Sequence, residues 1–169
     1  MTNETDTPDD GADDGSENDQ DAPTEQPMVH CHAQFIKDMS FENPNALNAA
    51  DEDGIAPDVD MNVQVGINNV NDDLYEVTLT VEGKATRNDK HLFMVELHYA
   101  GLYAIKNVPK EHIESILYVH CPSLLFPFAR QIIAEVTSNG GYPPLLLNAI
   151  DFARMYQQQV ASKDPAETT

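Results

Sequence analysis

Two neighbouring segments of the chain, residues 59–67 and 75–82, alternate apolar and polar residues with a period of two. Successive side chains of a β-strand point to opposite faces of a sheet, so this pattern predicts two strands that are each buried on one side. The connection between them is short, which favours antiparallel pairing. The apolar positions are Val59, Met61, Val63, Val65, Ile67, Tyr75, Val77, Leu79 and Val81.

Two further strands are expected on either side of this pair. Residues 29–37 alternate more weakly, with Val29, Cys31, Ala33 and Phe35 as the apolar set. A polar turn at 86–90 leads to a fourth strand over 91–99, whose first face consists of Phe93, Val95, Leu97 and Tyr99. The second face consists of Leu92, Met94, Glu96 and His98. This second face is half apolar and half polar, and it suits either a protein partner or an ordinary, partly exposed sheet surface.

Helices are predicted after the strands. The first is expected over 109–119, and the second follows Pro122 and ends at Asn139-Gly140-Gly141, where glycine can adopt a left-handed conformation. Asn148 is positioned to cap a third helix that carries Phe152, Met155, Tyr156 and Val160. The second helix has a continuous apolar stripe formed by Leu125, Phe128, Ala129, Ile132, Ile133 and Val136.

Four strands followed by helices predict an α+β domain. The helices carry more apolar surface than one small sheet needs, which indicates either oligomer formation or an exposed apolar groove.

The chain is strongly acidic, with 29 Asp and Glu residues against 9 Lys and Arg residues. Residues 1–27 hold ten of the acids and no Lys or Arg, with few large apolar residues, so we expect a disordered acidic tail. We expect a domain over 28–161 and a second disordered tail over 162–169. The acidic domain argues against binding to nucleic acid or to an anionic membrane.

The expected location is the cytosol. The N-terminus lacks the apolar run of a secretory signal, no stretch approaches eighteen consecutive apolar residues, and two cysteines are too few for a disulfide scaffold.

No motif in the sequence indicates an enzyme. His30-Cys31-His32 and His120-Cys121 contain metal-ligating residue types, but on a strand His30 and His32 point away from Cys31. We therefore prefer the interpretation that the two cysteines are small buried residues, and we expect neither a metal nor a cofactor.

Four motifs cover about residues 30–159. They are Lys-Asp-Met-Ser-Phe-Glu-Asn-Pro-Asn at 37–45, Leu-Tyr-Glu-Val-Thr-Leu at 74–79, Cys-Pro-Ser-Leu-Leu-Phe-Pro-Phe-Ala-Arg at 121–130, and the Gly-Tyr-Pro-Pro-Leu segment at 141–145 with Ile-Asp-Phe at 150–152 and Tyr-Gln-Gln-Gln at 156–159. In content and order, these motifs resemble those of the SecB family of protein-export chaperones.

The resemblance implies a four-stranded antiparallel sheet with helices on one side, assembled as a dimer of dimers. It implies a holdase that binds unfolded preproteins, keeps them competent for translocation and delivers them to the SecA motor. Residues 40–57 are expected to form a crossing loop. The predicted SecA-docking positions are Asp38, Glu42, Met94 and Glu96. The candidate client-groove residues are Phe41, Leu147, Ile150, Phe152 and Met155, with ordinary core packing as the alternative for Phe152 and Met155. The predicted tetramer-interface residues are Leu125, Phe128, Ile132, Ile133 and Val136.

Two other functions remain open from the sequence. One is a SecB-like chaperone that controls a toxin–antitoxin pair, and the other is an enzyme, which would require a cluster of titratable residues in a pocket.

Overall fold

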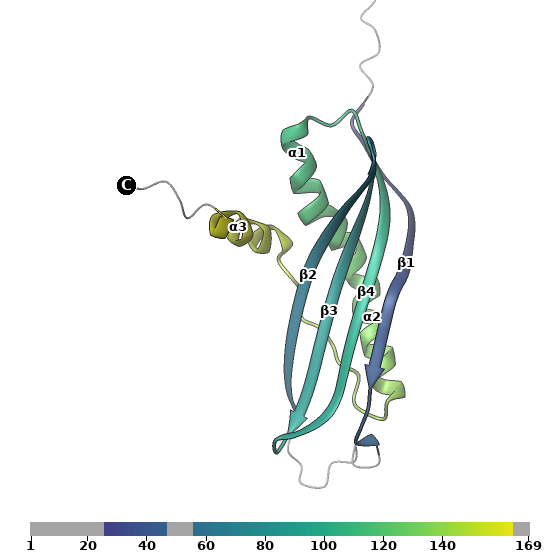
Figure 1. Ribbon diagram of the computed structural model, residues 1–169, viewed down its shortest axis with the longest axis vertical. Helices are drawn as coiled ribbons and strands as arrows, with labels where there is room; N and C mark the ends of the chain where they lie inside the picture. The colour runs from purple at the N-terminus through teal and green to yellow at the C-terminus, as the bar shows by residue number, and fades with distance from the viewer. Residues whose placement is uncertain (1–25, 47–55, 164–169) are drawn as a thin grey trace, which may run out of the picture.

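The computed structural model describes residues 26–46 and 56–163 and contains one four-stranded antiparallel sheet (Figure 1). Its strands are β1 (Met28–Glu42), β2 (Asp58–Asn71), β3 (Leu74–Arg87) and β4 (Lys90–Lys106), in the order β1-β4-β3-β2. Asn88 and Asp89 both have positive φ, as a two-residue hairpin turn between β3 and β4 requires. The predicted sheet is confirmed.

The strands are longer than the sequence pattern indicated. β1 continues to Glu42, into the predicted crossing loop, and β4 continues to Lys106. Residues 47–55 of that loop lie outside the described residues. Because β1 and β2 form opposite edges of the sheet, the chain crosses from one edge to the other between Glu42 and Asp58.

β1 contains two bulges, at His32 and at Lys37, where its pairing with β4 skips one residue. Each bulge reverses which face the following residues occupy. Val29 and Cys31 therefore face the helices, whereas Ala33 and Phe35 pair with Leu102 and Ala100 on the opposite face. The predicted strand is present, but the bulges divide its four alternating apolar residues between the two faces, because alternation in the sequence carries no signal for a bulge.

The helices cover one face of the sheet, which we call the inner face, and the core lies between the two layers (Figure 1). Val95, Leu97 and Tyr99 of β4 point into this core, as predicted. Leu92, predicted on the opposite face, is also buried, because the pairing of β3 with β4 is irregular between Ala85 and Thr86. A Cβ on Gly101 would lie 2.9 Å from a methyl group of Leu125, so glycine permits close approach of the helix.

One helix of 30 residues, Lys110–Asn139, replaces the two helices predicted on either side of Cys121. It consists of α1 (Lys110–Ser115), a π turn η2 (Ile116–His120) and α2 (Cys121–Asn139). Pro122 has no N–H, and in a regular α-helix its ring would clash with the carbonyl of residue 118. The wider π turn immediately before it lets the helix continue without a break.

By length and composition alone this helix could cross a membrane, although it contains no eighteen consecutive apolar residues. Its apolar side, however, packs on the sheet of its own chain. Cys121, Leu125, Ala129 and Ile133 are buried there. The helix is therefore buried along one side, although only 33% of its most apolar window is buried.

A network of hydrogen bonds holds the segment that follows α2. The buried Thr137 hydroxyl donates to the Ile133 carbonyl at 2.9 Å and accepts the Leu145 N–H at 2.9 Å. The Tyr142 hydroxyl lies 2.9 Å from Asn43 Oδ1 and 3.1 Å from the Leu92 carbonyl. Gly141 has φ 88°, which confirms the left-handed end of the helix.

α3 (Phe152–Lys163) extends away from the sheet and the long helix (Figure 1). Its base is attached by the ring of Phe152 against Phe126, at 6.0 Å, and by Tyr156 stacked on Tyr118 at 5.3 Å. Asp151, and not the predicted Asn148, accepts the hydrogen bond from the Arg154 N–H at the start of the helix. The predicted tails lie outside the described residues except for residues 26–27 and 162–163.

Candidate docking face of the sheet

The face of the sheet that points away from the helices, here called the outer face, carries acidic side chains from all four strands. Register places these residues in rows across β1, β4, β3 and β2, and residues in one row share a face. The rows that matter here contain Asp38, His98, Thr80 and Gln64; then Ser40, Glu96, Glu82 and Asn62; then Glu42, Met94, Lys84 and Asp60.

A shallow depression of about 390 Å³ lies on this face. The acids Glu42, Asp60, Glu82 and Glu96 line it, whereas Lys84 is its one lining cation. Met94 lies among them and is 45% exposed. The depression therefore combines net negative charge with an exposed apolar side chain, which suits a cationic protein segment.

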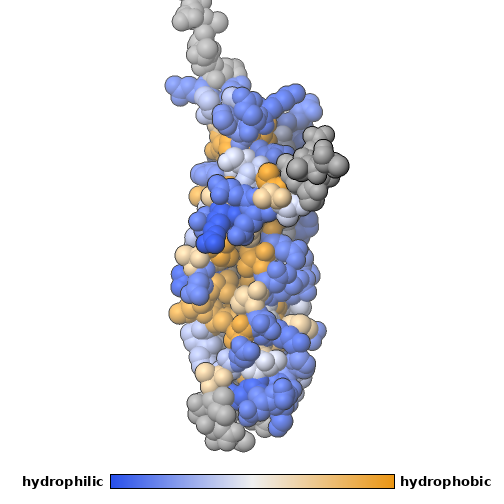
Figure 2. Space-filling model, turned by 90° about the vertical axis from the view of Figure 1, so that its left-hand side faces the viewer, coloured by the Kyte–Doolittle hydropathy of each residue, from blue (hydrophilic) through white to orange (hydrophobic). Residues whose placement is uncertain are grey.

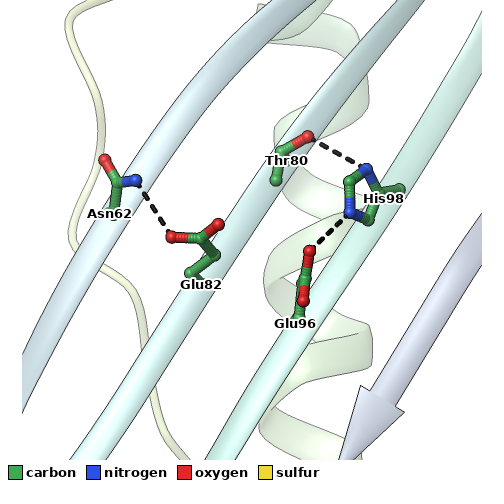
Figure 3. A network of polar contacts seen from close by, with 5 residues as sticks. All are labelled: Asn62, Thr80, Glu82, Glu96 and His98. Carbon is green, nitrogen blue, oxygen red and sulfur yellow. Dashed lines mark hydrogen bonds and ion pairs between the residues drawn. The ribbon is translucent and has the colours of Figure 1, made fainter.

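Hydrogen bonds from neighbouring side chains hold two of the acids (Figure 3). Asn62 donates through Nδ2 to Glu82 Oε2 at 3.0 Å. His98 Nε2 lies 2.8 Å from Glu96 Oε1, and its Nδ1 lies 3.2 Å from the Thr80 hydroxyl. The side chain of Glu96 is 44% exposed and that of His98 is 31% exposed, so both remain accessible.

All four residues predicted to dock a partner lie together on the outer face. Asp38 pairs in register with His98, and Glu42 pairs with Met94, next to Glu96 on β4. The bulge at Lys37 is needed for this arrangement, because without a skipped residue Asp38 would follow Ile36 onto the wrong face. Lys37 itself forms a salt bridge with Glu76 on β3.

The structure adds residues that the sequence pattern did not single out. Asp60, Asn62, Thr80 and Glu82 belong to the same surface as the four predicted positions. Period-two alternation placed each of them on the polar side of its strand. The register between strands, which brings them into rows, could not be read from the sequence.

The candidate client-groove residues are not gathered on one open surface. Leu147 and Phe152 are buried, at 6% and 3% exposure. Phe41 packs on Phe93 at 5.7 Å and lies close to Gly140 at the end of the long helix. Ile150 and Met155 are partly buried against the core.

Open apolar surface occurs elsewhere. Figure 2 shows an apolar band in the middle of the side of the molecule that faces left in Figure 1, bordered by hydrophilic residues. β2 forms the sheet edge on that side, and its residues Val63, Val65 and Ile67 are only partly buried. Leu146 is 61% exposed and lines an open depression of about 570 Å³ with Pro144 and residues of α2.

The predicted tetramer-interface residues divide into two groups. Leu125 and Ile133 are fully buried against the sheet of the same chain. Ile132 and Val136 are partly buried, and Phe128 is 48% exposed although its ring stacks on Tyr99 at 6.3 Å. Leu124 on α2 and the inner-face residues Ile36 and Met39 of β1 add further exposed apolar surface at this edge of the core.

Within residues 26–46 and 56–163, no three His, Cys, Asp or Glu side chains form a group that could hold a metal ion. His30 and His32 contact each other edge to face at 4.8 Å. Cys121 is fully buried, and burial raises the pKa of its thiol to about 12. The thiol is therefore neutral and unreactive at neutral pH.

The family model for the preprotein translocase subunit SecB matches residues 22–163. The protein-export protein SecB of Mesorhizobium japonicum is 49% identical over 141 residues, covering 83% of this chain and 84% of its own length. The protein-export protein SecB of Nitrobacter hamburgensis is 45% identical over 160 residues, covering 95% of this chain and 93% of its own length.

Among solved structures, the SecB-like chaperone of Mycobacterium tuberculosis, in complex with a peptide from an antitoxin, superposes with a TM-score of 0.59. It covers 72% of this chain and 90% of its own, at 12% sequence identity, and so supports the fold alone. The family match spans most of the chain, and the relatives align along nearly all of it. The chain belongs to the SecB family.

Proposed function

We propose that this chain is a protein-export chaperone that binds unfolded preproteins in the cytosol, keeps them competent for translocation and delivers them to the SecA motor. The observation that carries the proposal is membership of the SecB family, whose curated relatives in Mesorhizobium and Nitrobacter are named protein-export proteins. The separate apolar and acidic surfaces of the structure support a division of labour between client binding and docking.

Client binding requires surface that tolerates many sequences. Apolar burial is non-directional, so exposed apolar surface can hold unrelated unfolded segments. The partly exposed residues on the β2 edge and the depression beside Leu146 provide such surface. Each client side chain buried there contributes about 1.5–3 kcal/mol before the cost of ordering the segment. Binding of only the unfolded state then delays folding without ATP.

Docking requires a different surface. In the SecB family the partner is the cationic C-terminal tail of the SecA motor, and the outer face has the matching charge. Asp38, Glu42 and Glu96 surround Met94 there, next to Glu82. A cationic segment on this face would gain electrostatic attraction at its rim and apolar contact at Met94.

Self-association is the third part of the proposal. Phe128 and Leu124 on α2 lie at the same edge of the core as Ile36 and Met39 on β1, and all four are at least 39% exposed in the single chain. A second copy would remove this apolar surface from water. Four copies, arranged as a dimer of dimers, would place several client surfaces on one particle and raise avidity for a long unfolded chain.

We propose no enzymatic activity, in keeping with the SecB family. The export relatives, at 45–49% identity, also favour export over control of an antitoxin, because the antitoxin-bound neighbour shares only 12% of its residues with this chain.

Native mass spectrometry of the purified chain, mixed with a urea-denatured preprotein, tests assembly and client binding together. We expect a tetramer and a tetramer with bound client, and a refolding preprotein should fold more slowly in its presence. A monomer that leaves the refolding rate unchanged would contradict the proposal.

Two adjacent leucines provide a matched test of the client surface. Leu146 is 61% exposed, whereas Leu147 is 6% exposed. Leu146→Ser should weaken client binding and leave the free energy of unfolding nearly unchanged. Leu147→Ala should lower that free energy by about 2–5 kcal/mol. Equal client binding by Leu146→Ser and the unaltered chain would move the client site away from this depression.

A further inference from the structure

We propose that His98, oriented by Thr80, is a positioning residue that holds the Glu96 carboxylate in place for docking of a cationic protein segment. The inference rests on the proposed docking function of the outer face and adds to it a residue outside the four docking positions. It also makes docking sensitive to pH.

The hydrogen bonds define the state of the imidazole ring. An ionised carboxylate only accepts hydrogen bonds, so the contact of 2.8 Å with Glu96 requires the proton on His98 Nε2. In the neutral ring Nδ1 is then an acceptor, and the Thr80 hydroxyl at 3.2 Å donates to it. Thr80, His98 and Glu96 thus form a chain of donors directed at one carboxylate (Figure 3).

Glu96 needs such support because of its neighbour. Glu82 lies directly opposite Glu96 in register, and like charges in directly opposed positions repel. Glu96 is also exposed, and its long side chain has several rotamers available to it. A donor from His98, in the next row of the same strand, restricts Glu96, and Asn62 on β2 restricts Glu82 in the same way. A carboxylate ordered before binding loses less conformational entropy when a cation docks.

Protonation of His98 changes the charge of the outer face without breaking the hydrogen bonds that join Thr80, His98 and Glu96. The groups around the ring are mostly acidic. Glu96 lies on its own strand, Asp38 pairs with it from β1, and Glu82 lies one row away on β3, while the nearby Lys37 is paired with Glu76. Gln64, in the same row on β2, is neutral. A protonated ring offsets one of these acids, so a cationic partner should bind more weakly at pH 6 than at pH 8.

The test measures binding of a fluorescent peptide of Lys, Arg, Gly and Ser, free of histidine, to the full chain. The peptide is acetylated at its N-terminus, because a free α-amino group titrates near pH 8, and its dye has no group that titrates between pH 6 and 8. Any change with pH therefore arises on the chaperone. For the unaltered protein we expect affinity to be about three- to fivefold lower at pH 6 than at pH 8. His98→Ala should reduce affinity about three- to fivefold at pH 8 and remove most of the pH dependence.

His98→Gln distinguishes positioning from loss of a side chain. The glutamine amide can donate to Glu96 as Nε2 does, but it does not titrate. We expect affinity at pH 8 within about twofold of the unaltered chain, with no fall at pH 6. His30→Ala is the control, because His30 is an exposed histidine at the far end of β1 that contacts His32. It should leave both the affinity and its pH dependence unchanged.

Nitrogen-15 NMR of the ring gives a readout independent of binding. At pH 8 the spectrum should show His98 with its proton on Nε2, and Thr80→Val should produce a mixture of tautomers. Thr80→Val retains His98, so the role of the hydrogen-bond chain can still be tested if His98→Ala fails to fold. A proton on Nδ1 in the unaltered chain would overturn the inference.

The failures of the two proposals are distinguishable. If Glu96→Gln weakens peptide binding but His98→Ala does not, His98 has no positioning function and the docking face stands. If His98→Gln is as weak as His98→Ala, the hydrogen bond to Glu96 is not the cause and the inference is wrong. If neither Glu96→Gln nor Asp38→Asn changes binding, the docking function of the outer face fails as well.

Discussion

The two faces of one strand, β4, illustrate how the chain separates stability from interaction. Val95, Leu97 and Tyr99 are buried beneath the long helix, whereas Met94, Glu96 and His98 alternate with them on the exposed outer face. The inner set packs in the core of its own chain, and the outer set carries charge that contributes little to folding. A substitution on one face of β4 should therefore change either the stability of the fold or its interactions, with little effect on the other.

The largest expected effect comes from the inner face. Leu97→Ala removes a fully buried side chain and should lower the free energy of unfolding by about 2–5 kcal/mol, measured by urea denaturation at fixed protein concentration. The adjacent change Glu96→Gln should alter it by less than about 0.5 kcal/mol. Similar losses from the two variants would show that the faces are not energetically separate.

A substitution at the exposed edge of the inner face should give the next largest effect, on assembly. Phe128 is 48% exposed beside the inner face, and Phe128→Asp would place an unpaired charge in the proposed contact between copies. We expect assembly to weaken by about 2 kcal/mol, seen as smaller species in native mass spectrometry. Gln131→Asp, on an exposed position of the same helix, is the matched control. A stable tetramer of Phe128→Asp would place the contact elsewhere.

The buried hydroxyl of Thr137 tests hydrogen bonding on the inner side. Thr137→Val keeps the volume but leaves the Leu145 N–H without its acceptor, which should cost about 1–3 kcal/mol in urea denaturation. Thr137→Ser retains the hydroxyl and should cost less than Thr137→Val. The reverse order would mean that packing of the methyl group, and not the hydrogen bond, matters at this position.

The outer face gives the smallest effect in free energy. The double change Asp38→Asn and Glu42→Gln should weaken binding of a cationic peptide by about 1 kcal/mol at 0.05 M salt, measured by fluorescence anisotropy. The difference should shrink at 0.5 M salt, because exposed charges are screened over a few ångströms there. Glu111→Gln, on an exposed position of α1, should change nothing. An effect that is the same at both salt concentrations would exclude an electrostatic contribution.

Most of the difference between the inner and outer faces of the sheet was predicted from the sequence. Period-two alternation identified the buried residues of β3 and of the centre of β4, because a half-buried strand requires that pattern. In β2 it identified residues that are only partly buried, and Met61 on the same side is exposed. Family resemblance then brought Asp38, Glu42, Met94 and Glu96 together, and the structure places them on one face.

Features that depend on a partner strand or a neighbouring turn escaped prediction. The bulges at His32 and Lys37 and the irregular pairing near Leu92 leave no mark in hydropathy. Pro122 indicated a helix start, but the π turn before it accommodates the ring within one continuous helix. The chain of Thr80, His98 and Glu96 needs the register of β3 against β4, which alternation alone does not determine.

The bulges of β1 have a consequence for how this protein avoids unwanted partners. β1 is an edge strand, and its 15 residues lie opposite the 13 residues from Met94 to Lys106. Two extra residues increase the local twist and interrupt the spacing of free N–H and carbonyl groups along the outer side of the strand. An extended polypeptide finds no long, regular ladder to continue there. At the β1 edge, an unfolded chain can therefore be held by its side chains without continuing the sheet through its backbone.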